Sequence, residues 1–255
     1  MTDTVIYLEN RGGGFIFHWF LYNIAGLLDF TNQAKPIKFS IDISEPFHGE
    51  TIELLKPDFE FIDPKNLNNY KIIKYHGAPL LSNNIEVDKK YYIFLRNQIL
   101  FKNSLNKDAT PHRKLYISRN KSHLLKANQD CFNGNIKRKI FKEDVVYSIL
   151  EGLGFEFIYL EDYSLKDKIN LFQDASMIVT PNGGALTLAL FAHEKTKLVE
   201  IHSKIYDGHD QYMILCKNIG LWFERYDNTT VVNNDIYIHD GNHFRNFIQD
   251  IINIT

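Results

Sequence analysis

The feature that most constrains the fold lies in the second half of the chain, where short apolar runs alternate with longer amphipathic stretches. Apolar runs bounded by Gly and Pro are typical of buried strands, and an amphipathic stretch between two such runs is typical of a helix. Repeated strand–helix–strand units build a parallel sheet that is covered by helices on both faces. The predicted strands are Leu115–Ser118, Phe155–Leu160, Met177–Thr180, Leu198–Ile201 and Leu221–Tyr226, and the predicted helices are about Glu143–Leu150, Leu165–Asp174, one from Gly184, Gln211–Asn218 and His243–Ile252.

The first half follows the same logic less regularly. A Gly-rich turn, Gly12-Gly13-Gly14, separates the first predicted strand from a helix over about Phe17–Leu28. The predicted strands of this half are Val5–Leu8, Ile37–Ile41, and stretches near Phe59–Ile62, Lys71–Lys74 and Tyr91–Leu95. Because 255 residues are enough for two domains, we expect an α/β fold of two Rossmann-like lobes, residues 1–111 and 112–255, each with a parallel sheet flanked by helices.

The composition excludes several classes of protein. With 44% hydrophobic and 24% charged residues, the chain is expected to fold and not to be disordered. Its 29 basic and 31 acidic side chains give a net charge of −2, so no overall positive field attracts nucleic acid, and no nucleic-acid partner is expected. The cysteines, Cys131 and Cys216, are far apart in the sequence, which predicts two buried thiols and neither a disulfide nor a zinc site.

The N-terminal region bears on location. The first residues lack the basic and apolar regions of a secretion signal, which favours the cytoplasm. The most apolar segment, residues 15–30, falls short of the roughly 18 apolar residues that a membrane span requires, and it contains His18, Asn23 and Asp29. We therefore expect a buried helix there and no membrane span.

Ligands of an open parallel sheet bind at the carboxyl ends of its strands, so the residues that follow each strand are the first candidates for a site. The stretch Thr180–Thr187 (Thr-Pro-Asn-Gly-Gly-Ala-Leu-Thr) follows one predicted strand and opens a helix. A glycine turn at a helix start exposes unpaired backbone N–H groups and the positive end of the helix dipole, which suits a phosphate or diphosphate. The alternative is that Gly183 and Gly184 only form a tight turn.

Charged residues mark two more strand ends. Ser118 and Arg119 end the strand that Arg113 precedes, and a basic cluster follows at 138–142. Guanidinium groups can neutralise a diphosphate where no metal does, although a run of charges can also be a solvated face. Glu200 ends another strand, where its carboxylate could accept hydrogen bonds from a ribose or could pair with a nearby Lys or Arg. The sequence leaves both alternatives open.

Metal-binding patterns are weak. The sequence contains no Asp-x-Asp motif, which argues against a divalent ion that bridges a diphosphate. His239, Asp240 and His243 have the residue types of a metal cluster, but no further ligand stands in register with them, so we expect a polar loop.

Six of these stretches together resemble glycosyltransferase family 61. They follow the order and spacing of that family over about Arg113 to Tyr226, and in the first half Phe17-His18-Trp19 is similar to a short His-containing motif of the family. The six stretches are Arg113–Arg119 (RKLYISR), 138–143 (RKIFKE), Leu153–Phe155, Ser164–Phe172, Thr180–Thr187 and Val199–Ile201. The family usually has His at the position of Asn182 and Asn at that of Lys142.

The resemblance implies a GT-B-like pair of lobes, with the acceptor on the first lobe and a nucleotide-sugar donor, favoured as a UDP-sugar, on the second. It implies an inverting transfer of a hexosyl, pentosyl or N-acetylhexosaminyl group to a hydroxyl, as on a glycan, without a metal or other cofactor. Arg119 would face the donor diphosphate, the turn at Asn182–Ala185 would cradle it, and Glu200 would hold the ribose. The implied donor-binding residues are Arg113, Ser118, Arg119, Glu143, Pro181, Asn182, Gly183, Gly184, Ala185 and Glu200.

An inverting transfer needs a base that deprotonates the acceptor hydroxyl. His18 is our candidate, because His titrates nearest neutral pH and His18 lies on the helix of the first lobe. It could equally be a core histidine among Phe and Trp, and Asp29, Glu9 and Asp42 are the substitutes.

Two other functions compete. An NAD-dependent oxidoreductase would place a dinucleotide on Gly12-Gly13-Gly14 with Asp42 on the ribose, but Phe17 stands where a third glycine is needed and Asp42 comes late. A catalytically inactive sugar- or nucleotide-binding module, or an inactive partner of a transferase, would fit the departures from the family at Asn182 and Lys142.

Overall fold

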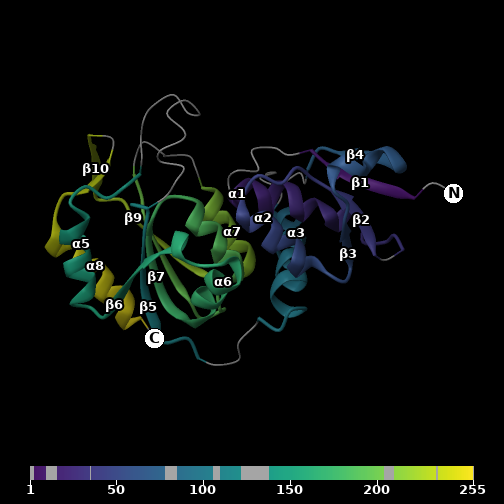
Figure 1. The fold of residues 1–255 in the computed structure, drawn as a ribbon. Helices are drawn as coiled ribbons and strands as arrows, with labels where there is room; N and C mark the ends of the chain where they lie inside the picture. The colour runs from purple at the N-terminus through teal and green to yellow at the C-terminus, as the bar shows by residue number, and fades with distance from the viewer. Residues whose placement is uncertain are drawn as a thin grey trace. The chain divides into compact units, whose positions relative to one another are not determined.

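The computed structural model describes residues 3–9, 16–34, 36–77, 85–105, 110–121, 138–203, 210–233 and 235–254. The chain divides into two compact units, residues 1–106 with 164–166 and residues 107–163 with 167–255 (Figure 1). Each unit contains a parallel sheet flanked by helices, which confirms the predicted α/β fold class. The Gly12-Gly13-Gly14 turn and Cys131 lie outside the described residues, and Cys216 is a buried free thiol.

The first unit is built on a sheet of four parallel strands in the order β3-β2-β1-β4. Its strands are β1 (Thr4–Leu8), β2 (Ile37–Ser40), β3 (Phe59–Phe61) and β4 (Lys71–Tyr75), and its helical elements are α1 (Ile16–His18), η1 (Trp19–Asn23), η2 (Ile24–Phe30), α2 (Pro46–Leu55), η3 (Pro64–Asn69), α3 (Ile85–Leu95) and η4 (Arg96–Phe101). The run α1-η1-η2 buries Trp19, Phe20 and Leu27 and is the predicted buried helix. The Trp19 indole donates a hydrogen bond to the Thr51 hydroxyl of α2 at 3.1 Å.

One predicted strand of this unit is wrong. Residues Tyr91–Leu95 form the end of α3. Tyr91, Tyr92 and Leu95 are buried while Ile93 is exposed, and two adjacent buried residues with a third at i+4 fit the face of a helix. The aromatic and β-branched character of the run predicted a strand, but packing against η2 and η4 determines the helix.

The second unit contains five parallel strands in the order β6-β5-β7-β8-β9. Its elements are β5 (Arg113–Ser118), α5 (Glu143–Glu151), β6 (Phe155–Tyr159), η5 (Leu160–Asp162), α6 (Leu165–Asp174), β7 (Ala175–Pro181), η6 (Gly184–Phe191), β8 (Lys197–Ile201), α7 (Gln211–Ile219), β9 (Trp222–Tyr226), β10 (Thr229–Val232), β11 (Asp235–Ile238) and α8 (Gly241–Asn253). Every strand and helix predicted for this half is present, with η6 as a 3₁₀ helix.

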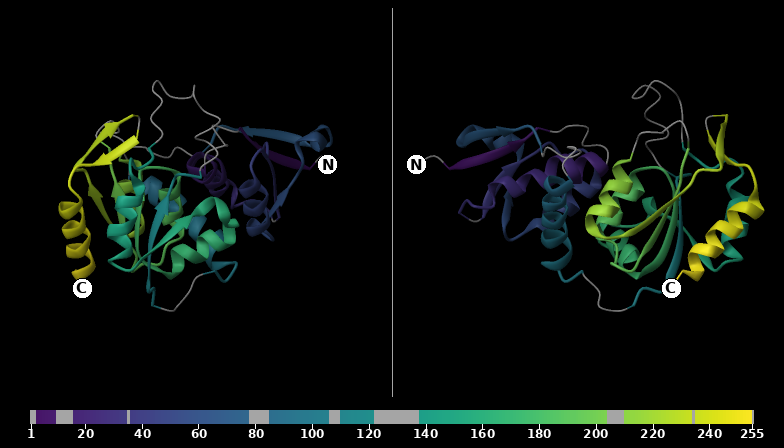
Figure 2. Two further views of the ribbon diagram at one scale, coloured as in Figure 1. Left: turned by 60° about the vertical axis from the view of Figure 1, so that its left-hand side comes forward. Right: turned by 180° about the vertical axis from the view of Figure 1, so that it is seen from behind.

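The two faces of this sheet are covered by different helices. Helices α5 and α8 cover one face, and α6 and α7 lie on the other (Figure 2). Val146 and Phe244 pack with Tyr116, Val179 and Val199 in the core between α5, α8 and the sheet. Among the helices of the described residues, none combines the length and the apolar character needed to cross a membrane.

Candidate functional site

The order of the strands locates a crevice in the second unit. From β5 the chain runs to β6 on one side and then returns to β7 on the other, so the topological switch point lies between β5 and β7. Parallel strands part there at their carboxyl ends, and this is where open α/β sheets bind ligands. Ser118 and Arg119 stand at the end of β5, and Pro181, Asn182 and Gly183 at the end of β7. The structure therefore brings the two strongest sequence candidates together.

Arg119 lies directly against the glycine turn. Its Nη1 donates to the backbone carbonyl of Asn182 at 3.3 Å, and a Cβ added to Gly183 would lie 1.4 Å from the same nitrogen. The backbone of Gly183 is extended, so the glycine is required for room and not for a left-handed conformation. In this structure the Arg119 guanidinium occupies the space beside the Gly183 backbone that the sequence assigned to a phosphate.

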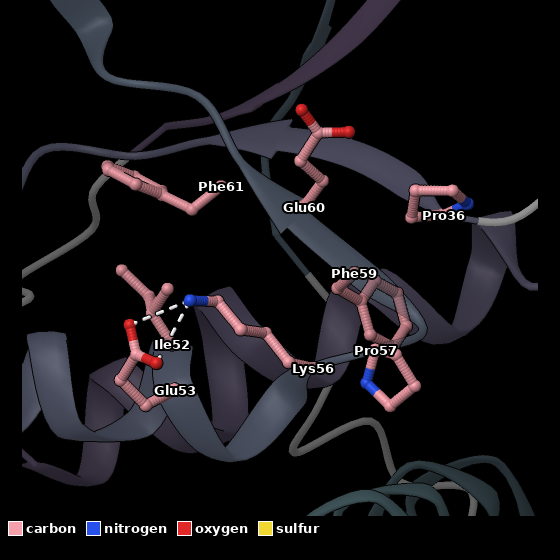
Figure 3. Close-up of a pocket in the computed structure, with 8 residues that line it drawn as sticks. All are labelled: Pro36, Ile52, Glu53, Lys56, Pro57, Phe59, Glu60 and Phe61. Carbon is pink, nitrogen blue, oxygen red and sulfur yellow. Dashed lines mark hydrogen bonds and ion pairs between the residues drawn. The ribbon is translucent and has the colours of Figure 1, made fainter.

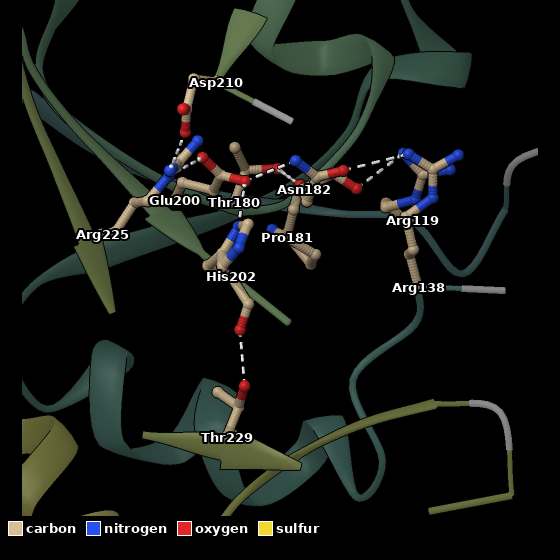
Figure 4. Close-up of polar contacts among 10 residues, drawn as sticks. All are labelled: Arg119, Arg138, Thr180, Pro181, Asn182, Glu200, His202, Asp210, Arg225 and Thr229. Atoms are coloured by element: carbon tan, nitrogen blue, oxygen red, sulfur yellow. Dashed lines mark hydrogen bonds and ion pairs between the residues drawn. The ribbon is translucent and has the colours of Figure 1, made fainter. Parts of the chain in front are cut away.

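A second guanidinium reaches the same residue. Arg138 donates to the Asn182 side-chain oxygen at 3.0 Å, and the Asn182 amide nitrogen donates to Glu200 (Figure 4). Only one orientation of the amide satisfies both contacts, because its oxygen accepts and its nitrogen donates. Asn182 therefore links a buried carboxylate to a cation at the crevice. Sequence reasoning placed Arg138 in a basic cluster without assigning it to the site.

Glu200 is fully buried, and both of its oxygens accept hydrogen bonds. Besides Asn182, it accepts from His202 Nδ1 at 2.9 Å and from Arg225 Nε at 3.1 Å. Arg225 in turn donates to Asp210 at 2.6 Å (Figure 4). Of the two alternatives that the sequence left open, the structure shows the pairing with an arginine, and the contact with a ribose stays a prediction.

The charge of Glu200 is held by these neighbours. Burial by itself acts to raise the pKa of Glu200, but the hydrogen bonds from His202 and Asn182, with the charge of Arg225, outweigh it and lower the pKa. Glu200 and Arg225 are in register across β8 and β9, which places the two side chains side by side. One chain of polar contacts thus leads to the crevice, and its members in order are Asp210, Arg225, Glu200, Asn182 and Arg138.

Ser118 at the end of β5 donates a hydrogen bond to Glu143. Glu143 begins α5, and its carboxylate accepts from Tyr116 at 2.7 Å, from Ser118 at 3.0 Å and from the Asn120 amide. Burial raises the pKa of Glu143, and the hydrogen bonds from Tyr116 and Ser118 offset this in part. Glu143 and Asn120 line a hollow of about 620 Å³ together with the ring of Phe157 and other residues.

The structure places Arg113 apart from the other predicted site residues of β5. It is the first residue of β5, at the opposite end of the strand from Ser118. Its guanidinium makes a paired contact with Glu156, Nε to Oε1 at 2.9 Å and Nη2 to Oε2 at 2.5 Å. Six residues of strand span roughly 20 Å, so Arg113 lies at the amino edge of the sheet, away from Ser118 and Arg119, and its role in binding a donor stays a prediction.

The histidine predicted as the base in the first unit lies among aromatic rings. His18 is half-buried, with edge contacts to Phe17 at 5.8 Å and Tyr22 at 5.2 Å between ring centroids. Its catalytic role stays a prediction.

The three substitutes all accept hydrogen bonds from other side chains or contact them. Asp29 accepts from Tyr75 and from Tyr91, the latter at 2.8 Å, and Asp42 accepts from Tyr7 at 3.1 Å. Glu9 contacts His76, a residue that sequence reasoning did not consider.

Of His239, Asp240 and His243, Asp240 caps a helix. Asp240 precedes α8 and accepts from the backbone N–H groups of Asn242 at 2.8 Å and His243 at 3.1 Å. An aspartate at this position stabilises a helix start by satisfying its orphan donors. In the part of the chain that the structure describes, no group of three or more His, Cys, Asp or Glu side chains could hold a metal ion.

A hollow of about 440 Å³ lies in the first unit (Figure 3). Pro36, which precedes β2, lines the hollow together with all three residues of β3, so the hollow lies along the whole of that short strand. Glu53 and Lys56 form an ion pair there at 2.9 Å. None of the site residues predicted from the sequence lines this hollow.

The fold and the site define an α/β protein with two guanidinium groups at a glycine turn, on the switch point of a parallel sheet. The chain belongs to glycosyltransferase family 61, because the family model described as Glycosyltransferase 61 matches residues 16–199, more than half of its length. This confirms the resemblance drawn from the motifs, and the match extends through most of the first unit.

Solved structures show more distant similarity. The iron-containing dodecameric glycosyltransferase TibC from enterotoxigenic E. coli H10407 has 13% sequence identity and a TM-score of 0.44, over 78% of this chain and 58% of that chain. TibC as a heptosyltransferase in complex with ADP-D-β-D-heptose has 14% identity and a TM-score of 0.43, over 79% and 58%. A chain of dipicolinate synthase from Bacillus halodurans has 10% identity and a TM-score of 0.22, over 100% and 99%.

The chain thus spans 58% of the length of the TibC chains that it matches. No curated protein matches it.

Proposed function

We propose that this protein is an inverting, metal-independent glycosyltransferase that moves a sugar from a nucleoside-diphosphate donor, favoured as a UDP-sugar, to a hydroxyl of a glycan. The observation that carries the proposal is the convergence of Arg119 and Arg138 on Asn182 at the switch point of the second unit. Membership of glycosyltransferase family 61 supports the reaction class.

The two guanidinium groups supply the countercharge that the leaving diphosphate needs. As the bond between the sugar and the diphosphate breaks, negative charge grows on the leaving oxygen. Charge-assisted hydrogen bonds from fixed donors strengthen with that charge and so lower the barrier. Arginine does this with planar, paired donors, so the step needs no divalent ion.

The buried polar chain holds Asn182, and through it the guanidinium of Arg138, in place before the nucleotide-sugar binds. Glu200 is held by Arg225 and His202, and it holds the Asn182 amide, whose oxygen receives Arg138. Because the partners of Asn182 set its orientation, Arg138 needs little reorganisation when a diphosphate binds. In this proposal the main role of Glu200 is to position Asn182, and a contact between Glu200 and a ribose is its lesser role.

The sugar inverts because the acceptor attacks from the face opposite the leaving group. A base takes the hydroxyl proton as the acceptor oxygen forms its bond to the anomeric carbon. The first unit provides the acceptor side in this proposal, with His18 as the base that the sequence suggests.

Turnover tests the proposal. The purified chain is incubated in EDTA with UDP-sugars and GDP-sugars and a panel of methyl glycosides as acceptors, and the release of nucleoside diphosphate is measured. We expect release from at least one UDP-sugar, and Arg119→Ala to lower it at least about 100-fold, as the loss of one oxyanion-type donor does.

Arg245→Ala is the matched control, because Arg245 is exposed on α8, and it should keep wild-type turnover. Binding of UDP without release from any donor would favour an inactive binding module. A shift in melting temperature with NAD alone would favour the oxidoreductase.

A further inference from the structure

A hollow of about 620 Å³ lies in the second unit, beside the candidate site. It is lined by α5, by the edge strand β6 and by residues that follow β5 or precede α5. Half of its lining residues carry charged or amide side chains, and the other half are apolar or aromatic. They are Asn120, Lys142, Glu143 and Asp144, and Ile140, Tyr147, Phe157 and Tyr159. A hollow of this size is typical of small-molecule sites.

Two consecutive residues connect the hollow to the crevice. Arg119 donates to the Asn182 carbonyl in the crevice at 3.3 Å. Asn120, the next residue, donates from its amide to the carboxylate of Glu143 in the hollow. A group that binds to Arg119 therefore has the hollow directly beside it.

The segment before α5 makes the same connection. Arg138 reaches the crevice and Lys142 lines the hollow, and both have a left-handed backbone, with φ of 55° and 54°. Ile140 between them is buried and forms a bridge with Ile236 of the hairpin. A residue with a Cβ adopts this conformation at a cost, and such strain is concentrated at functional sites. The two strained residues stand at the crevice and at the hollow.

Glu143 presents an acceptor in a fixed orientation. Its Oε1 accepts from Tyr116 at 2.7 Å, and its Oε2 accepts from Ser118 at 3.0 Å and from the Asn120 amide. A carboxylate has about four acceptor positions, so these three donors leave one for a ligand hydroxyl. Because the Asn120 nitrogen donates to Glu143, the Asn120 oxygen is an acceptor, and the Lys142 ammonium adds a donor.

The aromatic side of the hollow is suited to a sugar ring more than to a nucleobase. Phe157 makes edge contacts with Tyr147 at 4.6 Å and with Tyr159 at 4.9 Å between ring centroids. The Lys121 ammonium lies over the Tyr159 ring at 4.4 Å, so it covers one of the faces on which a base would stack. A pyranose carries hydroxyls that both donate and accept, and it fits a hollow that combines donors, acceptors and apolar rings.

We propose that this hollow is the subsite for the pyranose ring of the donor, whose diphosphate lies on the two arginines of the crevice. The inference rests on the proposed function. Glu143 and Asn120 accept hydrogen bonds from the sugar hydroxyls, Lys142 donates one, and the rings of Phe157 and Tyr159 contact the C–H groups of the sugar. The hollow thus selects the donor by its sugar, and the nucleoside lies outside it.

Binding of UDP with and without a sugar tests the inference. Wild type, Asn120→Ala and Tyr159→Leu are titrated calorimetrically in EDTA with UDP, UDP-glucose, UDP-galactose and UDP-N-acetylglucosamine. We expect at least one UDP-sugar to bind wild type more tightly than UDP does. Each variant should weaken that UDP-sugar about fivefold, the value of one hydrogen bond, and should keep the wild-type affinity for UDP.

Asn242→Ala and Tyr70→Leu are the matched controls. Asn242 is an exposed asparagine at the start of α8. Tyr70 is half-buried under the Lys38 ammonium at 5.5 Å, as Tyr159 is under Lys121. Both controls should bind UDP and the UDP-sugars as wild type does.

NMR gives a second readout that a merely structural role would not produce. In deuterated protein with protonated tyrosine rings, NOEs should connect the sugar protons of the bound UDP-sugar with the Tyr159 ring. The Tyr159 signals are assigned by their loss in Tyr159→Phe, which keeps an aromatic ring.

The other outcomes overturn the inference in different ways. Equal weakening of UDP and of the UDP-sugar in both hollow variants would place the nucleoside in the hollow. Wild-type affinity for the UDP-sugar in both variants, or no UDP-sugar that binds more tightly than UDP, would show that the hollow does not hold the sugar. In each of these cases, UDP binding that weakens in Arg119→Ala leaves the proposed function standing. If wild type binds neither UDP nor any UDP-sugar, both proposals fall.

Discussion

Two glycines are required for different physical reasons. At Gly183 the backbone is extended and the space is taken by the guanidinium of Arg119, whereas Gly77 has a positive φ and faces a backbone carbonyl of Tyr22. A guanidinium at the end of a flexible side chain can move, but a backbone carbonyl held in η1 cannot move without disturbing the unit. The same substitution should therefore affect function at one site and stability at the other.

We expect Gly183→Ala to lower the free energy of unfolding by less than about 1 kcal/mol, because only Arg119 must move. UDP binding should weaken about tenfold, the value of one charge-assisted hydrogen bond. Gly77→Ala should cost about 1–3 kcal/mol, because alanine at this φ is strained, and should leave UDP binding unchanged. Urea unfolding and UDP titration of both variants check this, and a Gly183→Ala variant that binds UDP as wild type does would contradict the role of Arg119.

Two buried carboxylates should give the stability opposite dependences on pH. The pKa of Glu200 is lowered, so its contribution is fully present above the ordinary value of 4.5 and is lost as the pH falls toward the lowered pKa. The pKa of Glu143 is raised, so its contribution is present below 4.5 and is lost as the pH rises through the raised pKa.

Glu200→Gln should therefore cost more at neutral pH, about 3–5 kcal/mol for a broken buried pair, than at acid pH. The cost of Glu143→Gln should instead shrink as the pH rises. Urea unfolding between about pH 3 and pH 7 measures both differences. If the losses of unfolding free energy in Glu200→Gln and Glu143→Gln changed with pH in the same direction, one of these carboxylates would not be held as described.

At the scale of elements, the β10–β11 hairpin pairs with the segment that directly follows Arg138. Ile236 of β11 pairs with the segment before α5, because the Phe141 N–H donates to the Ile236 carbonyl at 2.7 Å and the Ile236 N–H donates to the Lys139 carbonyl at 2.6 Å. The Ile236 side chain is fully buried in the core with α5 and α8. The hairpin thus couples the core of the second unit to the crevice.

Ile236→Ala should lower the free energy of unfolding by about 2–5 kcal/mol, because it leaves a cavity in this core. It should also weaken UDP binding several-fold at temperatures where the variant is folded, because Arg138 directly precedes the paired segment. Val145→Ala is the control, since Val145 is exposed on α5 and should change stability by less than about 0.5 kcal/mol. Calorimetry and UDP titration give both quantities, and unchanged UDP binding in folded Ile236→Ala would argue against the coupling.

The regular elements could be predicted where local signals and tertiary packing agree. The central strands of the second unit, β5, β7 and β8, are mostly buried and contain apolar runs, which are typical of strands in a parallel sheet even before their partners are known. The hairpin was missed because Thr229–Val232 and Asp235–Ile238 are short and mixed in polarity, and they are defined only by pairing with each other and with residue 140. Helix α2 was missed because its start depends on Pro46 and on backbone contacts to His48.

At the scale of the whole molecule, some residues of the candidate site could be predicted from where strands end in the sequence. Others are brought there only by the order of the strands in the sheet. Arg119, Asn182 and Gly183 could be predicted, because strand ends can be read from sequence. Arg225 and His202 could not, because their contacts with Glu200 depend on where β9 and the residues after β8 lie in the sheet.

The same limit applies in the first unit. Glu9 and His76 are separated by most of that unit in sequence and meet only because β1 and β4 are adjacent. Both units therefore carry charged residues at the carboxyl ends of adjacent parallel strands.

The central claim is that Arg119 and Arg138 together bind a nucleoside diphosphate. Calorimetric titration of UDP in EDTA, with wild type, Arg119→Ala, Arg138→Ala and the double variant, tests it most directly. We predict metal-independent binding that weakens about tenfold or more in each single variant, with a loss in the double variant that differs from the sum of the two because both groups share Asn182. UDP binding that both single variants keep at wild-type affinity would contradict the account.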